Sequence, residues 1–198
     1  GDHRDLHSFP YTTLFRSVLP VSAVVVVDEL WTLHCSEPST HGFTFDNSIA
    51  VTTPHVVDPT PENNSDSTDL TVDVIAEADV KIESQALVEP PSEMDVSQDV
   101  DVTLRKTLHN NGGYGPVEVS IAASAQAAAG CTATPSPDNP TSAVLPVSAV
   151  VVVDEHWTLH CSEPSTHGFT FDNSIAVTTP HVVDPTPENN SDSTDLTV

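Results

Sequence analysis

The C-terminal part of the chain brings together side chains of the types that bind zinc. They are His156, His160, Cys161 and His167. If this segment is a β-strand, alternate side chains point to opposite faces. His156 and His160 then share one face, and Cys161 shares the other with Trp157. An otherwise identical segment earlier in the chain has Leu30 at the position of His156. The pattern favours solvent-facing histidines, and we expect no metal ligands here.

The most acidic loop has some of the ingredients of a calcium site. It reads Asp-Pro-Thr-Pro-Glu-Asn-Asn-Ser-Asp at residues 184–192 and again at residues 58–66. Calcium takes about six to eight oxygen ligands, often from Asp, Asn and carbonyl groups. The Asp-x-Asp-x-Asp-Gly spacing of the known calcium loop is absent, however, and two prolines with an Asn pair suit a rigid turn. We predict a turn and no cofactor, with calcium as the alternative.

Motifs and charge exclude several classes of function. The sequence has neither a Gly-x-Ser-x-Gly nucleophile elbow nor a Gly-rich phosphate loop. It has 29 acidic and 5 basic side chains, a net charge of −24, whereas nucleic acids and anionic membranes bind basic faces. The longest apolar run, around residues 149–153, is far shorter than the ~20 residues that span a bilayer. We therefore expect no enzyme activity, no nucleic-acid partner and no membrane insertion.

An internal repeat organises the sequence. Residues 18–72 recur as residues 144–198, 126 positions later, and the two 55-residue copies differ only at Leu30 and His156. We interpret residues 18–72 as the C-terminal part of a truncated repeat and residues 73–198 as one complete repeat. The parent protein would then be a longer tandem array, in which each repeat has neighbouring repeats as partners. Duplication of one segment during sequence assembly is the alternative.

The first 17 residues need a separate interpretation. GDHRDLHSFPYTTLFRS resembles the translation of a common sequencing adapter. We interpret residues 1–17 as an adapter-derived artefact and exclude them from the fold, the alternative being a genuine basic-aromatic peptide. The acidic and basic side chains of this segment cancel, so the whole net charge belongs to the repeats.

Alternation of apolar and polar residues predicts about seven strands in the complete repeat. The alternating runs lie near residues 80–83, 100–108, 117–121, 157–161 and 169–177, with further strands at 147–153 and 196–198. The run at 147–153 interrupts the alternation and suggests a strand covered on both faces. The Ala-rich residues 122–129 are interpreted as the end of a strand that enters a loop. The spacing predicts an all-β fold, an Ig-like antiparallel β-sandwich.

The odd number of cysteines follows from the repeat. Cys131 and Cys161 lie 30 residues apart in the complete repeat, and Cys35 is the counterpart of Cys161. The counterpart of Cys131 would fall in the adapter-like segment. An even pair in an acidic β-sandwich indicates a Cys131–Cys161 disulfide and an oxidising compartment. Two reduced, buried thiols are the alternative.

Three segments resemble a known class of surface repeat. They are ADVKI at residues 78–82, HNNGGYGPVEVSI at 109–121 and FDNSIAVTTPHVVDPTPENNSDSTDLTV at 171–198. Together they resemble an Ig-like repeat of unknown function in bacterial and archaeal surface proteins, similar to the CARDB class, which ends D-P-x-P-x-N-N-S. The Cys131/Cys161 pair and the Ala-rich centre depart from that pattern.

The resemblance implies an extracellular or cell-surface location and a stalk or adhesion role without catalytic residues. We therefore expect a non-catalytic tandem repeat of a secreted or cell-surface protein that acts as a spacer. A cell-surface or carbohydrate ligand is not identified by these residues. The alternative function is an accessory module of a large secreted enzyme, with carbohydrate as its candidate ligand.

Overall fold

The computed structural model describes residues 24–198, so the adapter-like segment 1–17 lies outside the described residues. The chain divides into two compact units, with the boundary between Val74 and Ile75. The described part of the first unit and the second unit each contain strands and one 3-10 helix. The sequence interpretation places the start of the complete repeat at residue 73, two residues before the second unit begins.

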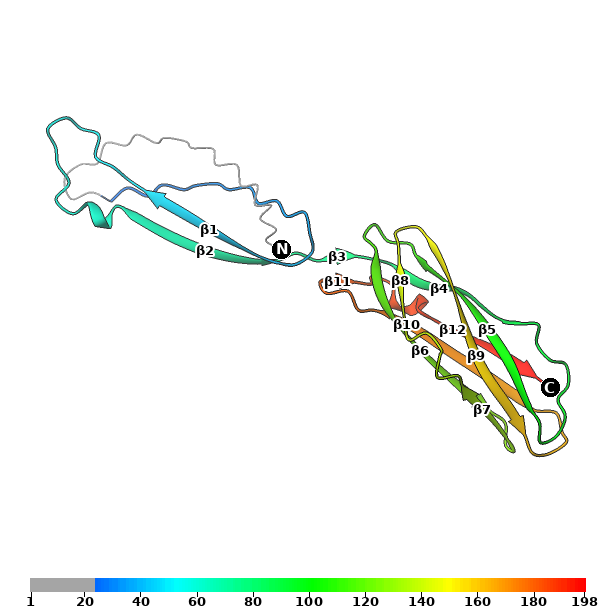
Figure 1. Ribbon diagram of the computed structural model, residues 1–198. Helices are drawn as coiled ribbons and strands as arrows, with labels where there is room; N and C mark the ends of the chain where they lie inside the picture. The colour runs from blue at the N-terminus through cyan, green and yellow to red at the C-terminus, as the bar shows by residue number, and fades with distance from the viewer. Residues whose placement is uncertain (1–23) are drawn as a thin grey trace. The chain divides into compact units, whose positions relative to one another are not determined.

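The second unit, Ile75–Val198, is an Ig-like antiparallel β-sandwich with two four-stranded sheets (Figure 1). One sheet has the order β4 (Val80–Val88), β5 (Asp99–Asn110), β9 (Val150–Cys161) and β7 (Cys131–Pro135). The other has the order β12 (Ser191–Thr197), β10 (Gly168–Val177), β6 (Val117–Ala127) and β8 (Ser142–Leu145). A short parallel pair joins β3 (Ala76–Glu77) to β11 (Val182–Val183), and η2 (Pro187–Asn189) precedes β12.

The core of this unit follows the alternation of the sequence. In β5, β9 and β10 every second side chain is buried, and the residues between them face outward. The inward apolar side chains form two clusters, one containing Leu108, Val153 and Ile175, the other Leu104, Trp157 and Phe171. Burial of one face of each sheet explains why period-2 sequences fold this way.

Several sequence predictions differ from the structure in detail. The predicted strands at 147–153 and 157–161 form one continuous strand, β9. The expectation that the first of them is covered on both faces is wrong, because Val150 and Val152 are more than half exposed while Val153 is buried. Strands β7 and β8 were not predicted, since both are short and the connection between them is rich in proline. The Ala-rich residues do end a strand, β6.

The first unit, which ends at Val74, has a two-stranded antiparallel sheet of β1 (Thr40–Ser48) and β2 (Ser65–Asp73), with η1 (Pro61–Asn63) between them. Phe43 pairs with Leu70, as Phe169 pairs with Leu196 in β10 and β12, so the two copies keep one register. Residues 24–35, the equivalents of the whole of β9, form no strand here.

Burial differs sharply between the two copies. Trp31 is 40% exposed, whereas its equivalent Trp157 is 2% exposed. Apart from Leu30 in place of His156, the sequence around these tryptophans is the same, so the difference arises from the strands that pack on them. In the second unit β9 lies between β5 and β7, and the described part of the first unit contains no equivalent of either strand.

In the part of the chain from residue 24 onward, no helix is long and apolar enough to cross a membrane.

Candidate functional site

Three polar side chains occupy core positions in the middle of the sandwich. Lys106 of β5 and Glu155 of β9 come from one sheet, and Asn173 of β10 comes from the other. Lys106 and Glu155 are fully buried, and Asn173 is 4% exposed. Each stands on the inward parity of its strand, where its neighbours are core residues. We call these three residues the core triad.

The core triad is held together by contacts of the lysine ammonium group. Lys106 Nζ forms an ion pair with Glu155 Oε1 and donates a hydrogen bond to Asn173 Oδ1, over 2.8 Å. Glu155 Oε2 and Asn173 Nδ2 are buried and have no hydrogen-bond partner among the described residues. One amine, one carboxyl and one primary amide therefore meet in a site from which water is excluded.

Burial governs the charge of the lysine. Removing the ammonium group from water lowers the pKa of Lys106, and the hydrogen bond and charge of Glu155 oppose this effect only in part. Desolvation of both ions offsets much of their attraction. The triad is thus a weak source of net stability, yet losing one partner would leave the other buried and unpaired.

The core triad separates the two apolar clusters of the core. On one side lie Leu108 of β5, Val153 of β9 and Ile175 of β10. Each of them is separated by two positions from the triad member of its own strand. Leu104, Trp157 and Phe171 stand two residues away in the opposite direction. None of the three triad members was expected from the sequence to be a site residue. The available signal was a polar residue at an apolar position in three alternating runs.

A disulfide closes one edge of the same sandwich. Cys131 of β7 lies directly opposite Cys161 of β9 in the sheet, and their sulfur atoms are bonded. The bond fastens the short edge strand β7 to a long central strand. Cys35, the equivalent of Cys161 in the first unit, is a free cysteine. The structure thus contains the disulfide that the repeat predicts.

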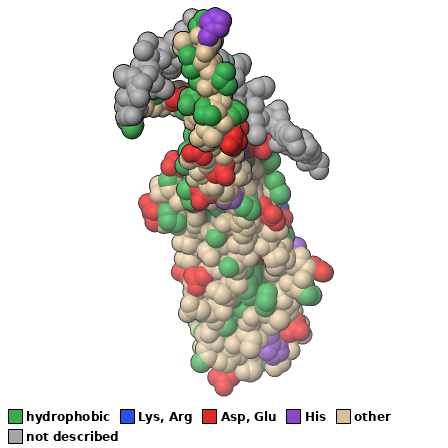
Figure 2. Space-filling view, turned by 90° about the vertical axis from the view of Figure 1, so that its left-hand side faces the viewer, with side chains coloured by type: hydrophobic (Ala, Val, Ile, Leu, Met, Phe, Trp, Pro, Cys, Tyr) green, Lys and Arg blue, Asp and Glu red, His purple; other side chains and the backbone are tan. Residues whose placement is uncertain are grey.

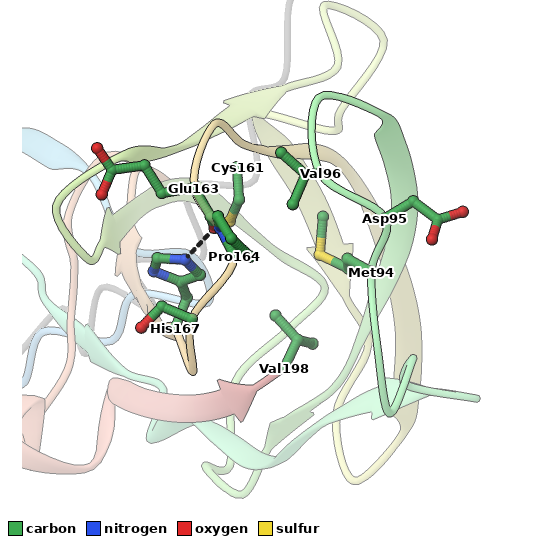
Figure 3. A pocket seen from close by; sticks show the side chains of 9 residues that line it. Met94, Asp95, Val96, Cys161, Glu163, Pro164, His167 and Val198 are labelled. Carbon is green, nitrogen blue, oxygen red and sulfur yellow. Dashed lines mark hydrogen bonds between the residues drawn. The ribbon is translucent and has the colours of Figure 1, made fainter.

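A small cavity of about 190 Å³ lies beside the disulfide (Figure 3). Cys161 and His167 line it together with Met94 and Val198. A ring nitrogen of His167 lies within 4.8 Å of both cysteine sulfurs, and Nε2 is 2.9 Å from the carbonyl oxygen of Glu163. The two sulfurs are bonded to each other, so they offer no thiolate to a metal.

The other two histidines of the sequence analysis lie on the outer face of β9. His156 Nδ1 is 3.1 Å from the Thr103 hydroxyl, and His160 Nδ1 is 2.9 Å from the Asp99 carboxylate. Both histidines thus share a face opposite to that of Cys161. The four residues considered for zinc are not brought to one place.

The acidic loop forms a hydrogen-bonded turn. The Asp184 carboxylate accepts hydrogen bonds from the Thr186 backbone N–H, at 3.0 Å, and from Asn190 Nδ2, at 2.8 Å. Asp58 has the same two partners in the first unit, the Thr60 N–H and Asn64. This Asx-type turn explains why Asp, Thr and Asn recur at fixed spacing in both copies.

The loop is also tied to the beginning of β4. The carboxylate of Asp79 accepts hydrogen bonds from the Thr186 hydroxyl and from Asn189 Nδ2, the latter at 2.9 Å. The Thr186 bond is the largest cause of a lowered Asp79 pKa, followed by the Asn189 bond, while burial opposes the shift. These bonds join residues more than 100 positions apart in the sequence.

A pH-dependent contribution to stability follows from Asp79. Because its pKa is lower in the folded protein than its ordinary 3.8, the contribution is complete above the unfolded value and lost as the pH falls through the folded value. We expect the stability advantage of the native chain over Asp79→Asn to shrink as the pH is lowered below about 4. Urea unfolding midpoints at several pH values measure it. The advantage should be smaller in a Thr186→Val background, and a pH-independent advantage would contradict the assignment.

No family model matches the sequence, and no curated protein matches it. A solved structure, the GAE domain of GGA2p from Saccharomyces cerevisiae, is similar to 58% of this chain and 97% of its own, with 8% identity and a TM-score of 0.32. The fold class therefore stands on the strands and sheets of the chain itself, which define an all-β protein with an antiparallel β-sandwich.

Proposed function

We propose that this chain is part of a non-catalytic tandem repeat protein, secreted or on the surface of a bacterial or archaeal cell, in which each Ig-like repeat acts as a stalk or adhesion spacer. The observation that carries the proposal is the duplication. One sequence of 55 residues occurs twice, and one copy completes a sandwich closed by a disulfide. A disulfide persists in an oxidising compartment, which supports a location outside the cytoplasm.

The dimensions and charge of the sandwich suit a spacer. Strand β9 has 12 residues, which at about 3.3 Å per residue gives a unit roughly 40 Å long. Asp and Glu side chains are spread over the face shown in Figure 2, and the chain as a whole carries a net charge of −24. Like charges on successive repeats repel one another, so an array stays soluble and resists collapse.

The aromatic side chains of the second unit favour a spacer over a carbohydrate-binding module. Carbohydrate binding would favour an exposed aromatic platform. In Ile75–Val198 the Trp and both Phe side chains are at most 2% exposed, and Tyr114 packs against the core. Within this described unit the aromatic residues therefore serve packing.

Surface display tests the spacer role. The chain is placed on yeast between a membrane anchor and a small reporter domain, with one, two or three copies of residues 73–198. We expect antibody access to the reporter to rise with copy number, because each copy adds roughly 40 Å. A flexible linker of equal residue number is the control.

Two results would contradict the proposal. One is reporter access that does not depend on copy number. The other is retention of labelled cell-wall polysaccharide by the displayed chain without the reporter, which would favour the accessory module of a secreted enzyme.

A further inference from the structure

We propose that Lys106 and Asn173 become joined by an intramolecular isopeptide bond between Nζ and Cγ, with Glu155 as the proton carrier. The bond would link β5 of one sheet to β10 of the other, across the middle of the sandwich. This inference concerns the core triad alone and does not depend on the spacer function.

The first argument is proximity. Nζ of Lys106 is 2.8 Å from Oδ1 of Asn173, and Oδ1 is bonded to Cγ at about 1.23 Å, so Nζ lies at most about 4 Å from the carbon it would attack. The two residues are 67 positions apart, but the sandwich fixes them side by side. Such positioning turns a slow bimolecular reaction into an intramolecular one.

The second argument is that the reaction balances with the groups present. Lys106 first transfers a proton from its ammonium group to the Glu155 carboxylate. The lone pair of the neutral amine then attacks Cγ, and the Nζ–Cγ bond forms. Glu155 relays a proton from Nζ to Nδ2, the Cγ–Nδ2 bond breaks, and ammonia leaves. The products are a secondary amide, ammonia and protonated Glu155, without oxidant, reductant or other co-reactant.

The third argument is the surroundings of the triad. A nucleophilic lysine must be uncharged, and burial lowers the pKa of Lys106. Apolar clusters on both sides exclude water, which would otherwise compete as the nucleophile. The two unpartnered atoms, Glu155 Oε2 and Asn173 Nδ2, are the proton carrier and the leaving group. Their lack of partners, costly in a structural ion pair, is what the reaction requires.

The first unit supplies an internal comparison. Its equivalents of Glu155 and Asn173 are Glu29 and Asn47, and the Asn47 amide nitrogen lies 3.1 and 2.9 Å from the two Glu29 oxygens when it faces them. The sequence has only two lysines, Lys81 and Lys106, and neither lies in that unit. The chain is therefore expected to lose one ammonia and not two.

Intact mass spectrometry of the full chain tests the proposal. After reduction of the disulfide, the mass is expected to be about 17 Da below that of the sequence, which is one ammonia lost to an amine nucleophile. Fragmentation of proteolytic digests should show the peptide with Lys106 joined to the peptide with Asn173. A cyclic imide at Asn111–Gly112 would also lose ammonia, but it would leave these two peptides separate.

Variants locate the reaction. Asn173→Ala and Glu155→Gln are expected to retain the ammonia that the native chain loses. Asn47→Ala, the matched change in the first unit, is expected to lose ammonia as the native chain does. Circular dichroism and a cooperative unfolding transition show that each variant is folded.

The proposal is overturned by a native chain that is folded and has the full mass of its sequence. A mass loss that maps to a single peptide also overturns it. Complete ammonia loss in Glu155→Gln would contradict the assigned role of Glu155. Because the native chain alone gives a decisive result, a variant that fails to fold does not obscure it.

Discussion

Lys106→Met is expected to lower the free energy of unfolding of the second unit by about 3–5 kcal/mol, the range for a buried ion pair that loses one partner. The variant leaves the Glu155 carboxyl in the core with neither a cation nor water to stabilise its charge. In a chain that carries the proposed bond, the ion pair is replaced by an amide beside a protonated Glu155, and the loss then comes from the missing cross-link between β5 and β10. Urea unfolding followed by Trp157 fluorescence measures it, in a Trp31→Phe background so that one tryptophan reports.

Lys81→Met is the matched control for this prediction. Lys81 is 3.6 Å from Glu83 in an ion pair that is partly exposed, and such pairs contribute about 0–1 kcal/mol. The double variant Lys106→Met/Glu155→Leu removes the stranded carboxyl and should recover part of the loss. Equal losses for Lys81→Met and Lys106→Met would show that the buried carboxyl is not destabilising.

The sandwich could be predicted because its long strands alternate regularly. In β5 and β10 the apolar residues mark the buried face without knowledge of the partner strands. The short strands β7 and β8 carry too few residues for a period-2 pattern to be recognised. The uniform valine run at the beginning of β9 also hides its alternation, because both faces carry the same residue type while only one is buried.

The core triad could be suspected but not assembled from the sequence. Lys106 interrupts an alternating apolar run, and so do Glu155 and Asn173. Which polar residues at core positions meet depends on the pairing of β5 with β9 and on the packing of β10 across the core. These are contacts between residues as many as 67 positions apart, and local pattern does not determine them. The bonds of Asp79 to the acidic loop have the same origin.

The two copies show which structural features the local sequence determines by itself. Identical residues form the same antiparallel pair in β1–β2 and in β10–β12, and the same Asx-type turn precedes β2 and β12. Burial is not reproduced, since Leu33 is 37% exposed and its equivalent Leu159 is fully buried. Hairpin register and turn chemistry are therefore local properties here, whereas the core requires the strands from β4 to β8.

Replacing both cysteines in Cys131→Ala/Cys161→Ala is expected to lower the free energy of unfolding of the second unit by about 3.5 kcal/mol, the chain-entropy value for a loop of this length. The disulfide spans 30 residues, and its removal enlarges the unfolded ensemble. It also releases β7 from β9, the strand with which β7 pairs in the sheet. Urea unfolding of the Trp31→Phe chain, followed by Trp157, measures the loss.

Cys35→Ala is the control for the disulfide, because Cys35 is free and lies in the other unit. It should leave the unfolding of the second unit unchanged. Reduction of the disulfide in the native chain should bring its urea unfolding midpoint close to that of the double variant, since both changes remove the same constraint from the unfolded state. The free energy of unfolding of the double variant could instead lie within about 0.5 kcal/mol of that of the native chain, as for an ordinary surface substitution. In that case the disulfide does not restrict the unfolded ensemble. The edge strand β7 would then be held by its hydrogen bonds and packing against β9 alone.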